Sequence, residues 1–345
     1  MTLYSLAFGI GSKDSAGNLL EVFYPAPQLS PDSELTQAIF SVVDYAGAGG
    51  NQVFELDSSH VNQMLDNFGA SQNQPMIDLL SQLVLSKKAL VLCLLESDGK
   101  PASVAEVYLK LHLLSHRLVK PHAVNLDGMF GLLPNVAWTS DGAIAINELS
   151  QRQLQARLQG RNLSVNSVDK FPKMTDYVVP SGVRIADTAR VRLGAYLGEG
   201  TTIMHEGFVN FNAGTAGEAM IEGRISAGVF VGKGSDLGGG CSILGTLSGG
   251  NKEVISVGEN CLIGANAGIG ISLGNNCTVE AGLYVTAGTK VTVLDKENKP
   301  VEIIKALELS GKDHLLFRRN STSGAVECLS NRSSIELNAE LHSHN

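Results

Sequence analysis

Aliphatic side chains recur at every sixth position over most of residues 185–291. A period of six suits neither an amphipathic helix, which repeats every 3.6 residues, nor an alternating strand. It is typical of a parallel β-helix, in which each sextet supplies one short strand and one inward-pointing aliphatic residue. The positions in phase are Ile185, Val191, Leu197, Ile203, Val209, Ile225, Val231, Leu237, Ile243, Val257, Ile263, Ile269, Leu273, Val279, Val285 and Val291.

Three sextets make one triangular coil, so the sixteen positions predict about five coils. In this repeat class the coil is left-handed, an exception to the right-handed crossover rule. Flat-faced coils of this kind commonly pack as closed trimers with ligand sites between neighbours, which predicts a homotrimer. The alternative is a glycine-rich β-sandwich whose six-residue spacing is accidental.

The period is interrupted over residues 210–222 and 247–253. Because these residues do not fit the six-residue step, we expect both segments to leave the coil as loops. Loops on a rigid scaffold often carry binding and catalytic residues. The first loop is therefore expected to form a wall of a site.

The N-terminal part has the pattern of an ordinary α/β domain. Strands are predicted over residues 3–11, 19–25 and 89–97, with a polar turn at residues 14–18. Helices are predicted over residues 33–46, with Ser33 as N-cap, over 103–119, and over 146–160, ending at Gly160. The predicted domains are 1–170, 171–295 for the β-helix, and a short β-rich C-terminal segment, 296–345.

Composition narrows the class of protein. The net charge is −8 with no basic run, which disfavours a nucleic-acid partner. Five cysteines without CxxC spacing favour reduced thiols over a disulfide or zinc framework. We find no signal peptide and no apolar stretch near the roughly 20 residues of a membrane span, so we expect a soluble cytoplasmic protein.

Two glutamates, Glu206 and Glu222, flank the first interruption in an otherwise apolar setting. Glu206 lies three residues after Ile203 and Glu222 three before Ile225, so both are expected at corners of the coil. A corner carboxylate is usually solvated and without a role. An apolar subunit junction can instead raise a carboxyl pKa and suit the group to proton transfer or nucleophilic attack.

Other residues near this segment have competing interpretations. Arg224 beside Glu222 is either half of a surface ion pair or a fork that holds a carboxylate or phosphate. His205 is a candidate base, although a structural role is about as plausible. The cysteines at 241, 261 and 277 are interpreted as small packing residues. The arginines at 318 and 319 either bind phosphate or face solvent.

Four longer strings carry a resemblance to a known family: "VRIADTARVRLGAYLGEGTTIMHEGFVNFNAG", "MIEGRISAGVFVGKGSDLGGG", "GTLSGGNKEVISVGENCLIGANAGIGISLG" and "EAGLYVTAGTKV". They resemble the longer form of the tetrahydrodipicolinate N-succinyltransferases, from about residue 170 to "LLFRRNSTSGAVE" and more loosely before it. The resemblance implies a trimeric enzyme that moves the succinyl group of succinyl-CoA to the amine of ring-opened tetrahydrodipicolinate, in the diaminopimelate and lysine pathway.

The resemblance also implies roles for residues. The glutamate of "EGRIS", Glu222, matches the proposed catalytic residue, drawn as an acyl-anhydride nucleophile. A general-base role, with direct attack of the amine on the thioester, stays open. The positions matching the succinyl-CoA groove are Arg224, Gly239, Ser242, Ala265, Glu280, Ala281, Gly288 and Lys305, with Arg318, Arg319, Asn320 and Ser321 as the strip that closes on the cosubstrate.

The resemblance further implies Mg²⁺ on the trimer axis at Glu206. A second metal carboxylate of some members is replaced by Ala189, with Asp187 two residues away. The main alternative function is another hexapeptide-repeat acyltransferase that uses acetyl-CoA, with His205 as base. A scaffold protein and a carbonic-anhydrase-like zinc protein are weaker alternatives, because the repeat contains no histidine besides His205.

Overall fold

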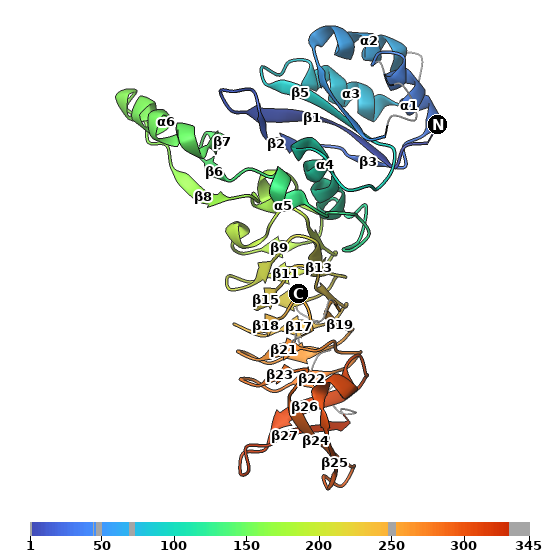
Figure 1. The fold of residues 1–345 in the computed structure, drawn as a ribbon, viewed down its shortest axis with the longest axis vertical. Coiled ribbons are helices and arrows are strands. Elements are labelled where there is room, and N and C mark those ends of the chain that lie inside the picture. Colours follow the sequence, from blue (N-terminus) through green and yellow to red (C-terminus); the bar gives the residue numbers. More distant parts are fainter. Residues whose placement is uncertain (1, 44, 46–49, 69–72, 248–252, 331–345) are drawn as a thin grey trace. The chain divides into compact units, whose positions relative to one another are not determined.

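A computed structural model of the 345-residue chain describes residues 2–43, 45, 50–68, 73–247 and 253–330. The chain divides into two compact units (Figure 1). The first consists mainly of residues 1–118 and 123–172, and the second mainly of residues 179–345. The proposed division into three domains, with a boundary at 296, remains a prediction.

The first unit is built on an antiparallel sheet with strand order β2-β1-β5-β4, to which β3 adds beside β1. Helices cover both of its faces. The strands are β1 (Ser5–Lys13), β2 (Leu19–Phe23), β3 (Gln28–Leu29), β4 (Gln52–Leu56) and β5 (Ala89–Leu95). The helices are α1 (Ser33–Phe40), α2 (Ser58–Phe68), α3 (Gln74–Leu83) and α4 (Val104–Ser115).

The central position of strand β5 accounts for its continuous apolar sequence. Leu90, Leu92 and Leu94 join one core with residues of α1, α2 and α3. Val91 and Cys93 point to the opposite face, because side chains alternate along a strand, and they too are buried. A strand covered on both faces needs apolar residues at every position.

A second, smaller sheet of order β7-β6-β8 follows α4 and α5 in the same unit. Its bounds are α5 (Met129–Leu132), β6 (Val136–Thr139), β7 (Gly142–Ala145), α6 (Ile146–Leu158) and β8 (Val165–Asp169). Ile144, Ala156 and Leu163 form its small core. Gly160 has a φ of 71°, which suits the predicted end of α6.

The predicted elements of this unit are present, with one corrected cap. The N-cap of α1 is Asp32 rather than Ser33, because the Asp32 carboxylate accepts the Leu35 N–H at 2.8 Å. Strand β4, helices α2 and α3 and the second sheet were not predicted. No helix in the described part of the chain is long and apolar enough to cross a membrane.

The second unit consists of short parallel strands stacked in three sheets, as in a parallel β-helix (Figure 1). Sheet I contains β9 (Arg184–Ile185), β11 (Thr202–Ile203), β14 (Met220–Ile221), β17 (Asp236–Leu237), β20 (Leu262–Ile263), β22 (Thr278–Val279) and β26 (Leu315–Arg319). Sheet II contains β12 (Phe208–Val209), β15 (Arg224–Ile225), β18 (Ser242–Ile243), β21 (Gly268–Gly270) and β23 (Tyr284–Thr286). Sheet III contains β10 (Ala195–Leu197), β13 (Ala213–Thr215), β16 (Phe230–Val231) and β19 (Ser256–Val257).

The repeat positions stack in register within each sheet. Ile203 pairs with Ile221, which pairs with Leu237, and Val209 pairs with Ile225. These parallel ladders exclude the β-sandwich alternative and confirm the predicted stack of aliphatic residues. Left-handedness and trimer formation remain predictions.

The prediction that residues 210–222 leave the coil is wrong. Thr215 pairs with Leu197 and Val231 in sheet III, and Ile221 pairs within sheet I. The period therefore continues from Val209 through Thr215 to Ile221, and within this stretch the coil is shortened between Ile221 and Ile225. Thr215 interrupts the aliphatic pattern, but it is buried with its hydroxyl 2.7 Å from that of Thr201.

The described residues on either side of the second interruption pair with each other rather than along the coil. Thr246 and Val254 form an antiparallel bridge, and the Leu247 N–H donates to the Glu253 carbonyl at 3.0 Å. Most of its predicted loop, 248–252, lies outside the described residues. Strands β25 (Pro300–Lys305) and β27 (Val326–Ser330), with β26, make the described part of the C-terminal segment β-rich, as predicted. Strand β24 (Lys290–Leu294) precedes the segment and pairs with both β25 and β27.

Candidate active site

The corners that lead from sheet I to sheet II carry six of the fourteen predicted site residues. We call this line of corners edge I–II. It comprises residues 186–190, 204–207, 222–223, 238–241, 264–267 and 280–283, on successive coils. Residues Glu206, Glu222, Gly239, Ala265, Glu280 and Ala281 all lie there. Arg224 and Ser242 begin the sheet II strands that follow.

Glu206 and Glu222 border the same small space beside Gly239. A Cβ atom built on Gly239 would lie 3.4 Å from Glu222 Oε2 and 3.8 Å from Glu206 Oε2. Since both distances start from one point, their sum limits the separation of the two oxygens to about 7 Å. The sequence suggested separate roles for the two glutamates, whereas the structure brings their carboxylates together.

The backbone around these carboxylates is held firmly. The corner containing Glu222 has two residues between its strands, whereas the corners of Glu206 and Gly239 have four. The Glu222 N–H donates to the Leu237 carbonyl at 2.8 Å, and the Glu222 carbonyl accepts the Gly240 N–H at 3.2 Å. The short corner thus fixes Glu222 between the coils on either side.

Arg190, which sequence analysis did not single out, holds the neighbouring corner. Its guanidinium donates to the Glu206 carbonyl at 2.9 Å and to the Gly207 carbonyl at 3.1 Å. The sequence does not indicate this role, because the partners of Arg190 are backbone atoms of another coil.

Gly239 differs from the glycines near it on the edge. A Cβ on Gly223 would meet the Cys241 sulfur at 2.3 Å, and one on Gly238 would meet the Ala265 nitrogen at 2.7 Å. Those two glycines are required by packing between coils. At Gly239 the nearest atoms are the two carboxylate oxygens, so a glycine there keeps space open in front of them.

Arg224 is exposed on the first position of β15, and its Nη2 donates to Ser242 Oγ at 2.6 Å. Ser242 itself is buried, so the bond anchors the guanidinium to the next coil. Nearby, burial and the Glu222 charge raise the pKa of the Cys241 thiol to about 12. That thiol, like those of Cys261 and Cys277, is buried, as predicted for packing residues.

Gly239, Ala265 and Ala281 occupy successive corners. The carbonyls of Gly239 and Ala265 each accept an N–H of the next coil at 2.8 Å. The N–H groups of these three residues donate no hydrogen bond within the described ranges of the chain. They are available to a bound molecule.

The C-terminal residues meet this edge through β26. Glu280 Oε2 accepts the Arg319 N–H at 2.5 Å. Glu327 accepts Arg318 Nε at 2.9 Å and Asn320 Nδ2 at 2.7 Å, and the Asn320 bond followed by the Arg318 bond and charge lowers the Glu327 pKa. The Arg318 side chain is therefore already paired within the chain.

Three predicted residues lie away from the corners. Gly288 is in the turn after β23, with open space around an added Cβ, and Lys305 ends β25 opposite Lys290. Ser321 is exposed in the turn between β26 and β27. The structure does not bring these three residues to Glu222 directly.

A single chain supplies few metal-ligating side chains near Glu206. Glu206 provides a carboxylate, the donor type that Mg²⁺ prefers. The described residues contain no group of three or more His, Cys, Asp or Glu side chains that could hold a metal ion. The carboxylate of Asp187 accepts the Ala189 N–H at 3.0 Å and so caps the short turn that follows it. A Mg²⁺ site at Glu206 remains a prediction that requires further copies of the chain.

Family models match three parts of the chain. The family model for the N-terminal part of tetrahydrodipicolinate N-succinyltransferase matches residues 48–131, and that for its middle part matches 133–173. A model for the hexapeptide repeat of succinyl-transferase matches residues 254–287.

The chain is similar to whole proteins as well. It is 63% identical to the 2,3,4,5-tetrahydropyridine-2,6-dicarboxylate N-succinyltransferase of Pseudomonas aeruginosa, covering 100% of this chain and 99% of that one. Identity to the Vibrio cholerae enzyme of the same name is 56%, covering 100% of both chains. A crystal structure from Campylobacter jejuni, described as a 2,3,4,5-tetrahydropyridine-2-carboxylate N-succinyltransferase, superposes with a TM-score of 0.89 at 35% identity, covering 96% of this chain and 93% of that one.

The stacked three-sheet coil and its glycine-rich corners, with carboxylates gathered on one edge, define a hexapeptide-repeat acyltransferase. Within that class, the chain belongs to the tetrahydrodipicolinate N-succinyltransferase family.

Proposed function

We propose that this chain transfers the succinyl group of succinyl-CoA to the amine of ring-opened tetrahydrodipicolinate, 2-amino-6-oxopimelate, and releases CoA. The activity is that named for relatives that match over the whole chain. The observation that supports a site on edge I–II is the space beside Gly239, which both Glu206 and Glu222 border.

In the first version of the mechanism, Glu222 is a nucleophile. Its carboxylate attacks the thioester carbonyl, the C–S bond breaks, and CoA leaves as a thiolate that takes up a proton. The substrate amine then attacks the succinyl carbonyl of the mixed anhydride, loses a proton, and restores the carboxylate. In the second version Glu222 removes the proton from the amine while the amine attacks the thioester directly. The C–S bond then breaks, and the departing CoA thiolate takes up the proton from Glu222, which restores the carboxylate.

Both versions develop negative charge on the thioester oxygen. The N–H groups of Gly239, Ala265 and Ala281, which have no acceptor within the described residues, are candidates to stabilise it or to bind the cosubstrate's amides. Arg224, anchored by Ser242, is placed in our proposal at a substrate carboxylate, for which its fork of donors is suited.

The assembly belongs to the same proposal. We expect a left-handed coil and a homotrimer in which edge I–II faces a neighbouring chain, so that the C-terminal strip from Arg318 to Ser321 closes on succinyl-CoA. Three copies of Glu206 would hold Mg²⁺, whose role would be to neutralise repulsion among the carboxylates.

A direct assay tests the reaction. CoA release is measured with succinyl-CoA or acetyl-CoA, using 2-aminopimelate as the amine acceptor. We expect turnover with succinyl-CoA and much slower turnover with acetyl-CoA. Absence of succinyl-CoA turnover would reject the proposed activity, and a preference for acetyl-CoA would favour the alternative acyltransferase.

Rapid-quench mass spectrometry separates the two mechanisms. A succinylated peptide containing Glu222 supports the anhydride. A ternary-complex kinetic pattern without any trapped adduct supports direct attack with Glu222 as the general base.

A further inference from the structure

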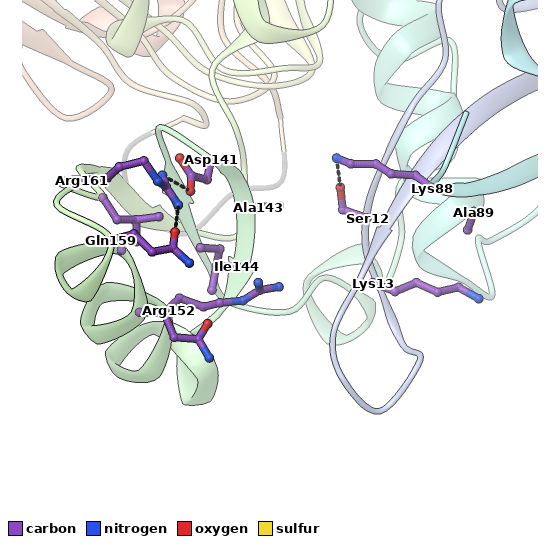
Figure 2. Close-up of a pocket in the computed structure, with 14 residues that line it drawn as sticks. Ser12, Lys13, Lys88, Ala89, Asp141, Ala143, Ile144, Arg152, Gln159 and Arg161 are labelled. Atoms are coloured by element: carbon purple, nitrogen blue, oxygen red, sulfur yellow. Dashed lines mark hydrogen bonds and ion pairs between the residues drawn. The ribbon is translucent and has the colours of Figure 1, made fainter. Parts of the chain in front are cut away.

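A second cavity, of about 310 Å³, lies entirely within the first unit (Figure 2). One wall is formed by residues 11–13 of β1 and by Lys88 and Ala89 at the start of β5. The other wall is formed by β7, α6 and the residues that follow α6. The walls are tied together where the Ser15 N–H, in the β1–β2 turn, donates to Glu148 Oε1 of α6 at 2.6 Å.

The cavity is rich in cations although the chain carries a net charge of −8. Lys13, Lys88, Arg152 and Arg161 line it, against the single carboxylate of Asp141. Two of these cations are already neutralised, because Lys13 pairs with Glu55 at 2.6 Å and Arg161 with Asp141 at 3.1 Å. Lys13 also runs away from the cavity (Figure 2).

Lys88 and Arg152 remain, one on each wall. Neither forms an ion pair within the described residues. Lys88 Nζ donates to Ser12 Oγ at 3.1 Å, and Arg152 extends from α6 toward the opposite wall (Figure 2). Glu148, one turn before Arg152, is engaged with Ser15.

The Lys88 wall is backed by a buried hydrogen-bond chain. Ser12 Oγ donates to Glu21, and the Tyr177 hydroxyl donates to the other oxygen of Glu21 at 3.1 Å. Burial raises the Glu21 pKa. The Ser12 hydroxyl thus stands between Lys88 and the nearest carboxylate behind the wall and fixes the direction of the ammonium group.

Between the two cations the lining is mixed: Ala89, Ala143, Ile144 and Leu163 supply an apolar floor, and Gln155 and Gln159 are among its polar residues. We propose that this cavity binds a small organic dianion whose two anionic groups reach Lys88 and Arg152, and whose short carbon chain covers the apolar floor. Each contact would be a charge-assisted hydrogen bond. Such a ligand would bridge the two walls.

Isothermal titration calorimetry on the full chain tests this site, with glutarate as the dicarboxylate probe and 3-phosphoglycerate as the carboxylate–phosphate probe. We expect one of them to bind, and Lys88→Gln and Arg152→Gln each to weaken its Kd by about tenfold. Arg157→Gln, on the same helix outside the cavity, is the matched control and should bind as the unaltered chain does. Glu222→Gln and Arg224→Gln should also retain this binding, which separates it from edge I–II.

Hydrogen exchange gives a second readout. A bridging ligand should slow amide exchange in α6 in the unaltered chain and leave it unchanged in Arg152→Gln. Failure of both probes to bind at about 10 mM, an affinity weaker than ordinary metabolite sites, overturns the proposal. Equal weakening by Arg157→Gln also overturns it, because the attraction would then be general electrostatics.

Discussion

Two edges of the β-helix follow the same six-residue repeat, but their corner residues differ in backbone conformation. On edge III–I, in the five corners that lead into β11, β14, β17, β20 and β22, the residue three positions before the sheet I core residue is left-handed. These residues and their φ angles are Gly200 (84°), Glu218 (37°), Gly234 (75°), Asn260 (54°) and Asn276 (57°). On edge I–II the equivalent residues Gly240, Asn266 and Gly282 are left-handed too, but Glu206 and Glu222 are not.

The difference separates corners set by backbone geometry alone from the corners of the proposed site. Glycine and asparagine are the residues that adopt the left-handed region at least cost, so the column on edge III–I is what a tight, repeated corner requires. Edge I–II lacks that conformation in its first three layers, at Thr188, Glu206 and Glu222, and the last two of these carry the carboxylates that border Gly239. The proposed site therefore lies where the edge departs from its repeated backbone conformation.

The largest expected effect compares two glutamates of one coil. Glu222→Gln keeps the side-chain shape but removes the charge that either mechanism needs, so kcat should fall by about 10³-fold. Glu218→Gln, on edge III–I, removes only an exposed ion pair with Lys233 and should change kcat by less than about twofold. Steady-state CoA release measures both.

If Glu222→Gln keeps more than about a tenth of the activity, Glu222 is neither the nucleophile nor the general base, and the proposed catalytic role of edge I–II is wrong. A matching loss in Glu218→Gln would instead place chemistry on edge III–I.

Adjacent glycines provide the next contrast. Gly239→Ala puts a methyl group between the carboxylates and should lower kcat/KM by about ten- to a hundredfold, with a change in unfolding free energy below about 1 kcal/mol. Gly238→Ala should destabilise by about 1–3 kcal/mol, because its Cβ would meet the next coil's backbone at 2.7 and 2.8 Å. Kinetics and thermal unfolding at one chain concentration separate the two. Equal destabilisation by both variants would contradict a functional reason for Gly239.

Substitution of one buried serine on each edge compares the two edges by their effect on KM. Ser242→Ala releases Arg224 and should raise KM by about threefold with kcat nearly unchanged, as expected when binding alone is weakened. Ser235, on edge III–I, instead donates to the Gly258 carbonyl at 2.7 Å and accepts the Cys261 N–H at 2.9 Å. Ser235→Ala should cost about 1–2 kcal/mol of stability and leave KM unchanged. An unchanged KM in Ser242→Ala would remove Arg224 from the substrate-binding role.

The six-residue period predicted the stacked parallel strands correctly, but it led to the wrong prediction that residues 210–222 form a loop. Aliphatic residues every sixth position predict parallel strands because each strand contributes one core residue per coil. Thr215 hid one such strand, since a threonine counts as polar until its partner Thr201 is known. The four-residue step from Ile221 to Ile225 hid another, and together they made residues 210–222 look like a loop.

Residue type and resemblance suffice to name the residues of the proposed site, but not the distances between them. Counting back three positions from Val209 and Ile225 places Glu206 and Glu222 in equivalent corners. Their convergence beside Gly239 depends on the length of each corner and on which coil lies next. The pairing of Arg318 with Glu327 likewise depends on β26 and β27 being neighbours, which no local pattern indicates.

The smallest expected effect concerns Glu218, the unusual residue among the left-handed corner positions of edge III–I. Glu218 is the one residue of that column other than glycine or asparagine, and a φ of 37° is unfavourable for a glutamate. Glu218→Asn should raise the unfolding free energy by about 1 kcal/mol, because asparagine tolerates this conformation and the exposed ion pair with Lys233 contributes little. Thermal unfolding at a fixed chain concentration measures the gain, with Lys233→Gln as the control for the ion pair. Since Glu218 lies outside the proposed site, kcat and KM should not change; a loss of stability in Glu218→Asn would mean that the column is not governed by backbone preference.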